Sequence, residues 1–269
     1  MSRELKDKII VVTGGADGLG YEITRNFLQK GAKTAIILDV KEDKGEESVK
    51  TLTSDFGEGK AEFIKCDVTK DLDEVTQKIL DKHKYVDVLV NNAGVFKESS
   101  IKLSIDINTT AVIEWSYKYL DHMRIDKGGK GGTIINISSI YGFRINQFLP
   151  IYQASKFAVF GFSKSLGHEY NYEKFGVRVV AICPGLTKTN MTTNSPMPRE
   201  PELMLEDMMT YAMGHDWQEP KDLGRGAVEV FEKAESGSAW LIEGGRPAVE
   251  VEKLLIWNYK QTVQFYLYE

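Results

Sequence analysis

The sequence predicts an α/β fold in which one parallel β-sheet is covered by helices on both faces. Short β-branched runs alternate along the chain with longer stretches in which apolar residues recur at helical spacing, an order typical of parallel sheets. The runs are apolar at both odd and even positions, which indicates strands buried on both faces. The 269 residues contain no internal repeat and no Pro/Gly/Ser linker, so we expect a single domain spanning residues 1–269.

The expected elements follow one another in a regular order. Strands are predicted at residues 9–13, 34–38, 61–66, 86–90, 133–137 and 177–183. Helices are predicted at residues 21–30, 72–83, 107–123, 152–174 and 222–235. From Met191 onward the alternation of strands and helices is lost. Together these elements predict a single-domain Rossmann architecture with a doubly wound parallel sheet.

Composition and charge argue against several classes of partner. The formal net charge is −5, which gives no general attraction to nucleic acid or to anionic lipid. No window approaches eighteen uninterrupted apolar residues, so we expect no membrane span. The two cysteines, Cys66 and Cys183, lie in apolar runs, and residues 1–8 lack the apolar stretch of a secretory signal. We therefore expect no disulfide and a cytoplasmic location.

A glycine-rich segment joins the first predicted strand to the first helical pattern. It reads Thr13-Gly14-Gly15-Ala16-Asp17-Gly18-Leu19-Gly20. Glycines let the backbone turn sharply and approach a pyrophosphate, which the N-terminus of the following helix stabilises. A glycine-rich turn alone serves a structural role about as often as it binds a nucleotide. Its place between a strand and a helix at the start of an alternating chain favours a dinucleotide site at Gly14, Asp17, Gly18, Leu19 and Gly20.

An acidic residue at the end of the second strand indicates which dinucleotide is bound. Asp39 lies about twenty residues beyond the glycine-rich segment, where a carboxylate accepts hydrogen bonds from the adenosine ribose and repels a 2′-phosphate. Lys41 follows two residues later, and we interpret it as a solvated loop charge. The alternative for Asp39 is a turn residue. We predict NAD as the cofactor.

A tyrosine and a lysine open the helical pattern after residue 150. Tyr152 and Lys156 are four residues apart, which places them on one face of a helix. A nearby ammonium lowers the pKa of a phenol, so Tyr152 can act as a general acid and base. The spacing alone arises by chance in most proteins.

Polar residues at the ends of two other strands support this interpretation. Ser138 and Ser139 follow the fifth strand, and Asn91-Asn92-Ala93-Gly94 follows the fourth. Ligands of open parallel sheets bind at the carboxyl ends of the strands, so these residues are expected in one crevice.

In this order the motifs resemble the classical short-chain dehydrogenase/reductase family. The resemblance covers residues 8–190 and rests on the TGxxxGxG segment, Cys66-Asp67-Val68, NNAG, Ser139 thirteen residues before Tyr152, YxxxK, and Pro184-Gly185. It implies that Tyr152 is the acid–base, that Ser139 holds the substrate oxygen, and that Ser138 is structural. It also implies that Lys156 binds the nicotinamide ribose and that Asn108 anchors a water in the proton relay.

Further cofactor contacts are implied by the same resemblance. They are Asp67 and Val68 at the adenine, Asn91, Ala93 and Gly94 beside the cofactor, Tyr152 and Lys156 at the nicotinamide end, and Pro184, Gly185, Leu186 and Thr189 near the carboxamide and pyrophosphate. The chain is most similar to the branch of 15-hydroxyprostaglandin-dehydrogenase-like and insect alcohol-dehydrogenase-like proteins. The apolar Phe148 and Leu149 depart from the mammalian prostaglandin enzyme and argue against prostaglandin itself.

Other catalytic arrangements find no support in the sequence. The four histidines are scattered and have no ligand spacing, so no metal site is expected. The glycine-flanked serine of a hydrolase is also missing.

The leading hypothesis is an NAD-dependent alcohol dehydrogenase acting on a hydrophobic alcohol that is secondary or allylic, and terpenoid, prostanoid-like or fatty. The alternatives are an NADH-dependent carbonyl reductase and a non-catalytic NAD-binding protein. The expected partners are a small hydrophobic alcohol or ketone and further copies of the chain, in a homodimer or homotetramer built on residues 107–123 and 152–174. The direction of the reaction, its stereochemistry and the choice between dimer and tetramer stay open.

Two C-terminal segments carry separate expectations. Six of the eight methionines lie between Met191 and Met213, so residues 191–215 are interpreted as a lid over an apolar substrate. The alternative is that Met204, Met208 and Met209 pack as one core-facing stripe of a helix. The aromatic tail at residues 244–269 is a lid, an oligomer surface or a docked segment.

Overall fold

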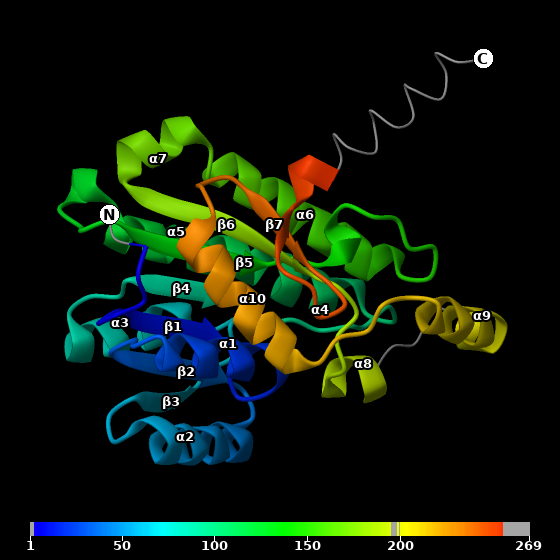
Figure 1. Cartoon of the computed structure of the whole chain (residues 1–269), viewed down its shortest axis with the longest axis horizontal. Helices are drawn as coiled ribbons and strands as arrows, with labels where there is room; N and C mark the ends of the chain where they lie inside the picture. The colour runs from blue at the N-terminus through cyan, green and yellow to red at the C-terminus, as the bar shows by residue number, and fades with distance from the viewer. Residues whose placement is uncertain (1–2, 195–197, 199, 255–269) are drawn as a thin grey trace.

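The computed structural model describes residues 3–194, 198 and 200–254. Its centre is one eight-stranded sheet in the order β3-β2-β1-β4-β5-β6-β7-β8 (Figure 1). Strands β1 to β7 are parallel, and β8 pairs with β7 antiparallel at the edge. The strands are β1 (Ile9–Thr13), β2 (Thr34–Asp39), β3 (Ala61–Lys65), β4 (Val88–Asn91), β5 (Gly132–Ile137), β6 (Val177–Pro184), β7 (Ala239–Ile242) and β8 (Val249–Glu250).

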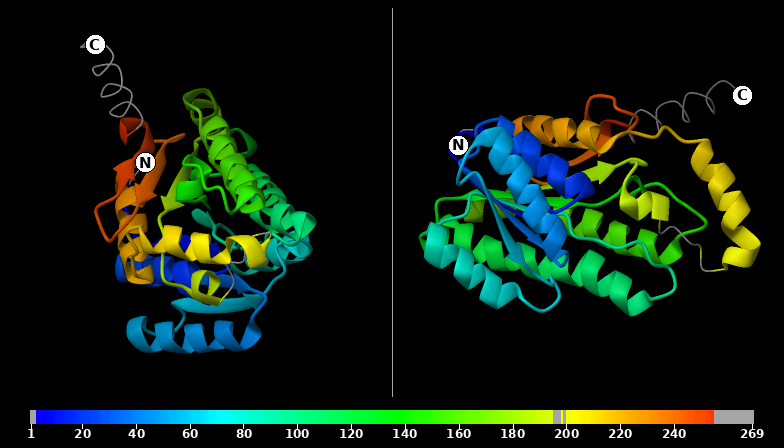
Figure 2. Two further views of the ribbon diagram at one scale, coloured as in Figure 1. Left: turned by 90° about the vertical axis from the view of Figure 1, so that its right-hand side faces the viewer. Right: turned by 90° about the horizontal axis from the view of Figure 1, so that it is seen from below.

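Helices cover both faces of the sheet, as the sequence predicts (Figure 2). Helices α1, α2 and α10 contribute side chains to the core on one face, and α3, α5 and α6 contribute to the other. The helices are α1 (Gly18–Gln29), α2 (Glu42–Phe56), α3 (Leu72–His83), α4 (Ile101–Ile105), α5 (Ala111–Met123), α6 (Pro150–Leu166), α7 (Glu169–Phe175), α8 (Asn190–Asn194), α9 (Pro201–Met213) and α10 (Pro220–Lys233).

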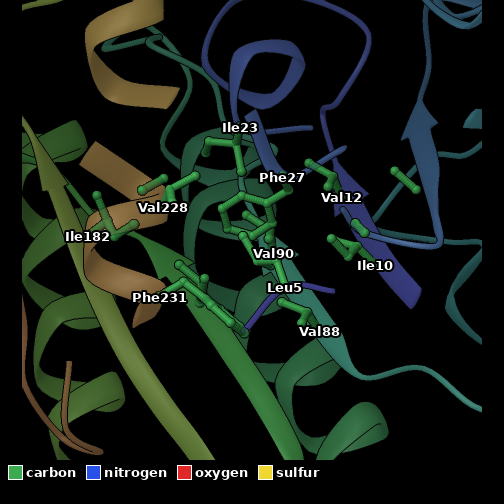
Figure 3. Packing of buried hydrophobic residues seen from close by; sticks show 14 of the residues in the cluster. Leu5, Ile10, Val12, Ile23, Phe27, Val88, Val90, Ile182, Val228 and Phe231 are labelled. Atoms are coloured by element: carbon green, nitrogen blue, oxygen red, sulfur yellow. The ribbon is translucent and has the colours of Figure 1, made fainter. Parts of the chain in front are cut away.

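Alternate residues of each strand face opposite cores. In β1, Ile10 and Val12 pack beneath α1 and α10, while Ile9 and Val11 pack on the other side. Figure 3 shows the first core, where the Phe27 and Phe231 rings lie edge to face with centroids 5.7 Å apart. Burial on both faces explains why all five residues of β1 are buried and why four of them are apolar.

The chain changes direction across the sheet between β1 and β4. β2 and β3 lie on one side of β1, whereas β4 to β7 extend on the other. A sheet wound this way leaves a crevice beyond the carboxyl ends of the two central strands. The glycine-rich segment after β1 and the NNAG segment after β4 meet at this point.

The structure departs from the predicted elements in several places. Helix α2 (Glu42–Phe56) is not among the predicted helices. The expected helix 152–174 ends at Leu166, and a separate helix, α7, begins at Glu169. The expected helix 107–123 begins with a π-helical turn at Asp106–Thr110 before α5. The prediction that the alternation is lost after Met191 is wrong, because α10 is followed by the parallel strand β7 and then by β8.

Candidate active site

A cleft of about 950 Å³ opens at the carboxyl ends of the parallel strands. Residues immediately after β1, β2, β3, β4 and β5 and the end of β6 line it, including Gly14, Cys66 and Pro184. The expected ligand crevice and the observed cleft are therefore in the same place.

The glycine-rich segment forms one wall of this cleft. Gly14 and Gly18 have φ values of +62° and +56°, a left-handed backbone that side chains disfavour. The Asp17 carboxylate accepts the N–H of Gly18 at 2.8 Å and so caps α1, whose N-terminus is directed at the cleft wall. Gly20 does not line the cleft. A Cβ there would lie 2.3 Å from the Gly14 carbonyl oxygen, so Gly20 permits the tight turn.

Asp39 and Asp67 lie at the end of the cleft formed by β2 and β3. One oxygen of Asp39 accepts the N–H of Ala16 at 3.2 Å, and the other accepts the N–H of Lys41 at 3.0 Å. The Lys70 ammonium, 2.8 Å from the Asp67 carboxylate, and hydrogen bonds from Thr69 lower the pKa of Asp67 to about 2. Both carboxylates are thus held in place as hydrogen-bond acceptors.

The wall beyond β3 and β4 is anchored from behind. Val68 lines the cleft, and its carbonyl oxygen accepts the indole N–H of Trp115 at 2.9 Å. Ala93 also lines the cleft, and its N–H donates to the Thr13 hydroxyl at 3.0 Å. These bonds fix the backbone on which a flat ligand would rest.

The two asparagines of the NNAG segment have different roles. The side chain of Asn91 is buried and donates to Ser116 and Asn136, and it does not line the cleft. Asn92 does line the cleft, and its amide donates to the carbonyl oxygens of Thr13 and Gly14. The ribose contact expected of Asn91 therefore stays a prediction for its backbone only. Asn92 thus lies in the crevice where the sequence places the NNAG segment.

Tyr152, Ser139 and Lys156 meet in the opposite half of the cleft. Tyr152 and Lys156 come from the first two turns of α6, and Ser139 follows β5. The Lys156 ammonium lies 5.7 Å from the centre of the Tyr152 ring and donates to the Ile137 carbonyl oxygen at 2.9 Å. Ser138 donates to the Lys156 carbonyl oxygen at 2.8 Å, which agrees with a structural role.

Burial shifts the pKa values of these two titratable groups in opposite directions. It raises the pKa of Tyr152 to about 12, against a lowering effect of the hydrogen bond with Ser139. It lowers the pKa of Lys156 to about 8. Desolvation is the largest influence on the pKa of Tyr152 in this structure, and the lowering expected from Lys156 stays a prediction.

Asn108 lies behind the wall of the cleft rather than lining it. It is fully buried in the π-helical turn before α5. Its side chain exchanges hydrogen bonds with the backbone of Val95 and donates to the Ser155 hydroxyl at 3.1 Å. A Cβ at Gly94 would lie 3.3 Å from the Asn108 side-chain oxygen and 3.7 Å from the Lys156 ammonium. Gly94, which lines the cleft, therefore lies beside Asn108 and Lys156.

The segment after β6 lines the cleft beside the glycine-rich segment. Pro184, Gly185, Leu186 and Thr189 all line it. A Cβ on Gly18 would lie 3.4 Å from the Thr189 methyl group, so the segment contacts the glycine-rich wall. Gly185 is held by its N–H bond to the Ile242 carbonyl oxygen at 2.8 Å.

The methionine-rich segment contributes less to the cleft than expected. Met191 lines it, whereas Met197 lies outside the described residues. Met208 is buried in an apolar cluster with Ile140 and Tyr152, and Met204 and Met209 are 36% and 55% exposed. Met204, Met208 and Met209 therefore do not form one core-facing stripe, and the lid stays a prediction.

Neither a candidate metal cluster nor a membrane-spanning helix is found among the described residues. Residues 3–194, 198 and 200–254 contain no cluster of His, Cys, Asp or Glu that could hold a metal ion. Within the same residues, no helix has the length and apolar character needed to cross a bilayer.

Two residues beside Tyr152 carry no motif in the sequence. Phe96 lines the cleft, and its ring centroid lies 4.4 Å from that of Tyr152. Glu98 is buried at 3% exposure and accepts backbone N–H groups at the start of α6. From the sequence, only their position shortly after the NNAG segment indicates that they lie near the cleft.

Comparisons with known proteins agree with this geometry. The family model described as short chain dehydrogenase matches residues 8–199. The 15-hydroxyprostaglandin dehydrogenase (NAD(+)) of Rattus norvegicus is 41% identical over 184 residues, 68% of this chain and 69% of that protein. Alcohol dehydrogenase 2 of Ceratitis cosyra is 31% identical over 258 residues, 94% of this chain and 98% of that protein.

Solved structures show the same fold. Levodione reductase superposes with a TM-score of 0.77 at 22% identity, covering 89% of this chain and 97% of that one. L-sorbose reductase from Gluconobacter frateurii, complexed with NADPH and L-sorbose, gives 0.75 at 24% identity, covering 91% and 98%. At these identities the likeness supports the Rossmann fold and no particular activity.

Proposed function

This chain belongs to the short chain dehydrogenase family, and from that premise we propose that it is an NAD-dependent dehydrogenase of a hydrophobic alcohol. The observation that carries the proposal is the single cleft that joins Asp39 and the glycine-rich wall to Tyr152, Lys156 and Ser139. The reaction interconverts the alcohol and its carbonyl compound.

The residues of the cleft fit a dinucleotide. The left-handed Gly14 and Gly18 let the backbone approach a pyrophosphate, and the N-terminus of α1 would stabilise its charge. The Asp39 carboxylate is placed to accept ribose hydroxyls and to repel a 2′-phosphate. The names of the mammalian relatives also specify NAD(+). These points favour NAD over NADP.

Proton transfer is assigned to the residues at the other end. When bound, NAD supplies the nicotinamide ring that accepts a hydride from the alcohol carbon. Ser139 orients the substrate oxygen through its hydroxyl, and Tyr152, once ionised, takes the proton from that oxygen. In the reverse direction, the Tyr152 hydroxyl returns the proton to the carbonyl oxygen. Lys156 stabilises the phenolate and would bind the nicotinamide ribose.

The cleft around Tyr152 favours an apolar substrate. Its side chains there include Phe96, Ile140, Leu186 and Met191. Phe148 and Leu149 are buried outside the cleft, so their apolar character is no argument against a prostanoid. Terpenoid, fatty and prostanoid-like alcohols therefore all remain in the proposed substrate class.

An absorbance assay at 340 nm with a panel of such alcohols tests the proposal. We expect NADH formation with apolar secondary or allylic alcohols, at least about tenfold more efficiently with NAD than with NADP, a difference of about 1.4 kcal/mol. Turnover only of carbonyl compounds with NADH would instead favour a reductase. NAD binding without turnover of either class would identify a non-catalytic protein.

The assembly and the location belong to the proposal as well. We expect a homodimer or homotetramer, in line with the sequence prediction for residues 107–123 and 152–174. Both cysteines are free and buried, which supports the expected cytoplasmic location.

A further inference from the structure

Glu98 is a buried carboxylate whose partners are backbone N–H groups. It is 3% exposed, and no ion pair joins it to a cation among the described residues. One of its oxygens accepts the N–H of Tyr152 at 2.7 Å, and the other accepts the N–H of Ile151 at 3.0 Å. A buried carboxylate is costly unless it is paired, so this pair of bonds is a specific feature of the site.

Helix α6 needs an acceptor at this end. It begins at Pro150, which has no N–H, and Leu149 at the N-cap has no side-chain oxygen. The N–H groups of Ile151 and Tyr152 would therefore lack a partner within the helix. Glu98 supplies both acceptors from a segment 53 residues earlier in the chain, and its negative charge lies at the positive end of the helix dipole.

The same segment also contacts the side chain of the tyrosine. The Phe96 ring lies 4.4 Å from the Tyr152 ring at an interplanar angle of 50°. Tyr152 is thus held at its backbone by Glu98 and at its ring by Phe96. We infer that Glu98 is a positioning residue that fixes the first turn of α6 so that the Tyr152 hydroxyl reaches the substrate oxygen, an inference that rests on the proposed role of Tyr152.

Two substitutions at Glu98 and one elsewhere provide the test. Glu98→Ala removes both acceptors, whereas Glu98→Gln keeps one carbonyl oxygen and turns an amide toward the second N–H. Asp87→Asn is the matched control, because Asp87 also accepts a backbone N–H, that of Ile9 at 2.9 Å, where β1 begins at the opposite end of the sheet.

The expected result is a loss in kcat with cofactor affinity preserved. Glu98→Ala should lower kcat by about tenfold or more, since small misplacements of a reacting group have effects of this size. Glu98→Gln should fall between Glu98→Ala and the parent. The NAD Kd, measured by tryptophan fluorescence, should stay within about threefold of the parent. Asp87→Asn should lower the Tm and leave kcat unchanged.

A second readout does not depend on turnover. Incorporated 3-fluorotyrosine gives one ¹⁹F NMR signal per tyrosine, and the signal missing in Tyr152→Phe identifies Tyr152. We expect the titration midpoint of that signal to move in both Glu98 variants and to stay fixed in Asp87→Asn. If Glu98→Ala does not fold, the comparison of Glu98→Gln with Asp87→Asn decides.

The results distinguish a failure of the Glu98 role from a failure of the proposed function. The positioning role would be overturned if the Glu98 variants kept the parent's kcat and an unmoved Tyr152 signal while Tyr152→Phe lost turnover. A parent protein that turns over no substrate of either class would refute the proposed function, and a moved Tyr152 signal would then still support the contact between Glu98 and the tyrosine.

Discussion

At the residue scale, burial shifts the pKa values of two titratable side chains in the cleft, Tyr152 and Lys156, in opposite directions. Burial disfavours the charged form of both, which raises the pKa of Tyr152 to about 12 and lowers the pKa of Lys156 to about 8. At neutral pH the tyrosine therefore holds its proton and the lysine remains mostly charged. This state is ready to donate a proton to a carbonyl, whereas alcohol oxidation needs the phenolate.

The pH dependence of the two directions should differ accordingly. Below the pKa of Tyr152 the phenolate fraction grows about tenfold per pH unit, so kcat/KM for alcohol oxidation is expected to rise with pH. No such rise is expected in kcat/KM for carbonyl reduction, which needs the protonated tyrosine. Initial rates between pH 6 and pH 10, with Tyr152→Phe as the inactive control, check this. An oxidation rate that is flat over this range would argue against Tyr152 as the base.

Burial of the charged Lys156 should lower the free energy of unfolding. Its pKa in the folded state is about 8 against an ordinary 10.5, so the unfolded chain binds more protons between these values. The free energy of unfolding should therefore rise as the pH passes from 8 to 10.5, and the full cost, up to about 3 kcal/mol, applies below pH 8.

Lys156→Met is expected to raise the Tm by several degrees at pH 7 while abolishing turnover. The gain should disappear above about pH 10.5, where the parent lysine is neutral in both states. Thermal melts of parent and variant at pH 7 and pH 10.5 measure the effect. An equal Tm difference at both pH values would show that packing, not charge, determines it.

Motif residues of the site could be predicted from the sequence, and the residues that hold them could not. Gly14, Asp39 and Tyr152 were found because their spacing follows from a local strand–turn–helix order. Glu98 was missed because its partners lie 53 and 54 residues away, and only the folded chain brings them together. Asn91 was placed in the cleft because the sequence does not show which way a side chain turns at a strand end.

At the element scale, the buried strands were predictable because most of their residues are apolar. β7 and β8 were missed because they have four and two residues and follow a long segment without strands. The expected helix 152–174 is divided at Gly167, where a Cβ would lie 2.5 Å from the Gly237 nitrogen and from the Val179 carbonyl oxygen. A helical pattern cannot reveal such a tertiary contact.

The methionines of helix α9 allow the lid interpretation to be distinguished from core packing. Met208 is 6% exposed and shares the apolar cluster that includes Tyr211 and Tyr152, whereas Met204, one turn earlier, is 36% exposed. Neither lines the cleft. The geometry therefore favours a packing role for Met208.

Met208→Ala should lower the free energy of unfolding by about 2–5 kcal/mol, as expected for a truncation in a core. The ranking of substrates by kcat/KM should be preserved. Met204→Ala is the matched control and should change stability by less than about 0.5 kcal/mol. A selective rise of KM for bulky alcohols in Met208→Ala, with the Tm unchanged, would instead support the lid.

At the scale of the whole molecule, hydrogen bonds at the switch point between β1 and β4 join the glycine-rich segment to the NNAG segment. Thr13 at the end of β1 accepts the N–H groups of Asn92 and Ala93 at 3.0 Å each, and the Asn92 amide donates back to Gly14. The glycine-rich segment and the NNAG segment are thus hydrogen-bonded to each other where the sheet reverses its winding.

The proposed oligomer can be tested on the outer face of α6. Ala154, Phe157, Ala158 and Gly161 are exposed there, and a Cβ at Gly161 would meet no atom within 4 Å. The neighbouring α5 exposes Tyr117, whose ring packs on Phe162 of α6 with centroids 5.8 Å apart. Small side chains beside exposed aromatic rings form a flat apolar surface suited to a second copy.

Gly161→Arg should therefore leave the protomer folded and disrupt its association. The arginine has room in the single chain, but on a face that pairs with itself across a two-fold axis it would place bulk and like charges against each other. Light scattering coupled to gel filtration at micromolar concentration should give a dimer or tetramer for the parent and a monomer for Gly161→Arg. Ser54→Arg, on the exposed side of α2, is the matched control and should keep the parent's mass. A parent that elutes as a monomer, or a Gly161→Arg variant with the full oligomeric mass, would remove α6 from the interface.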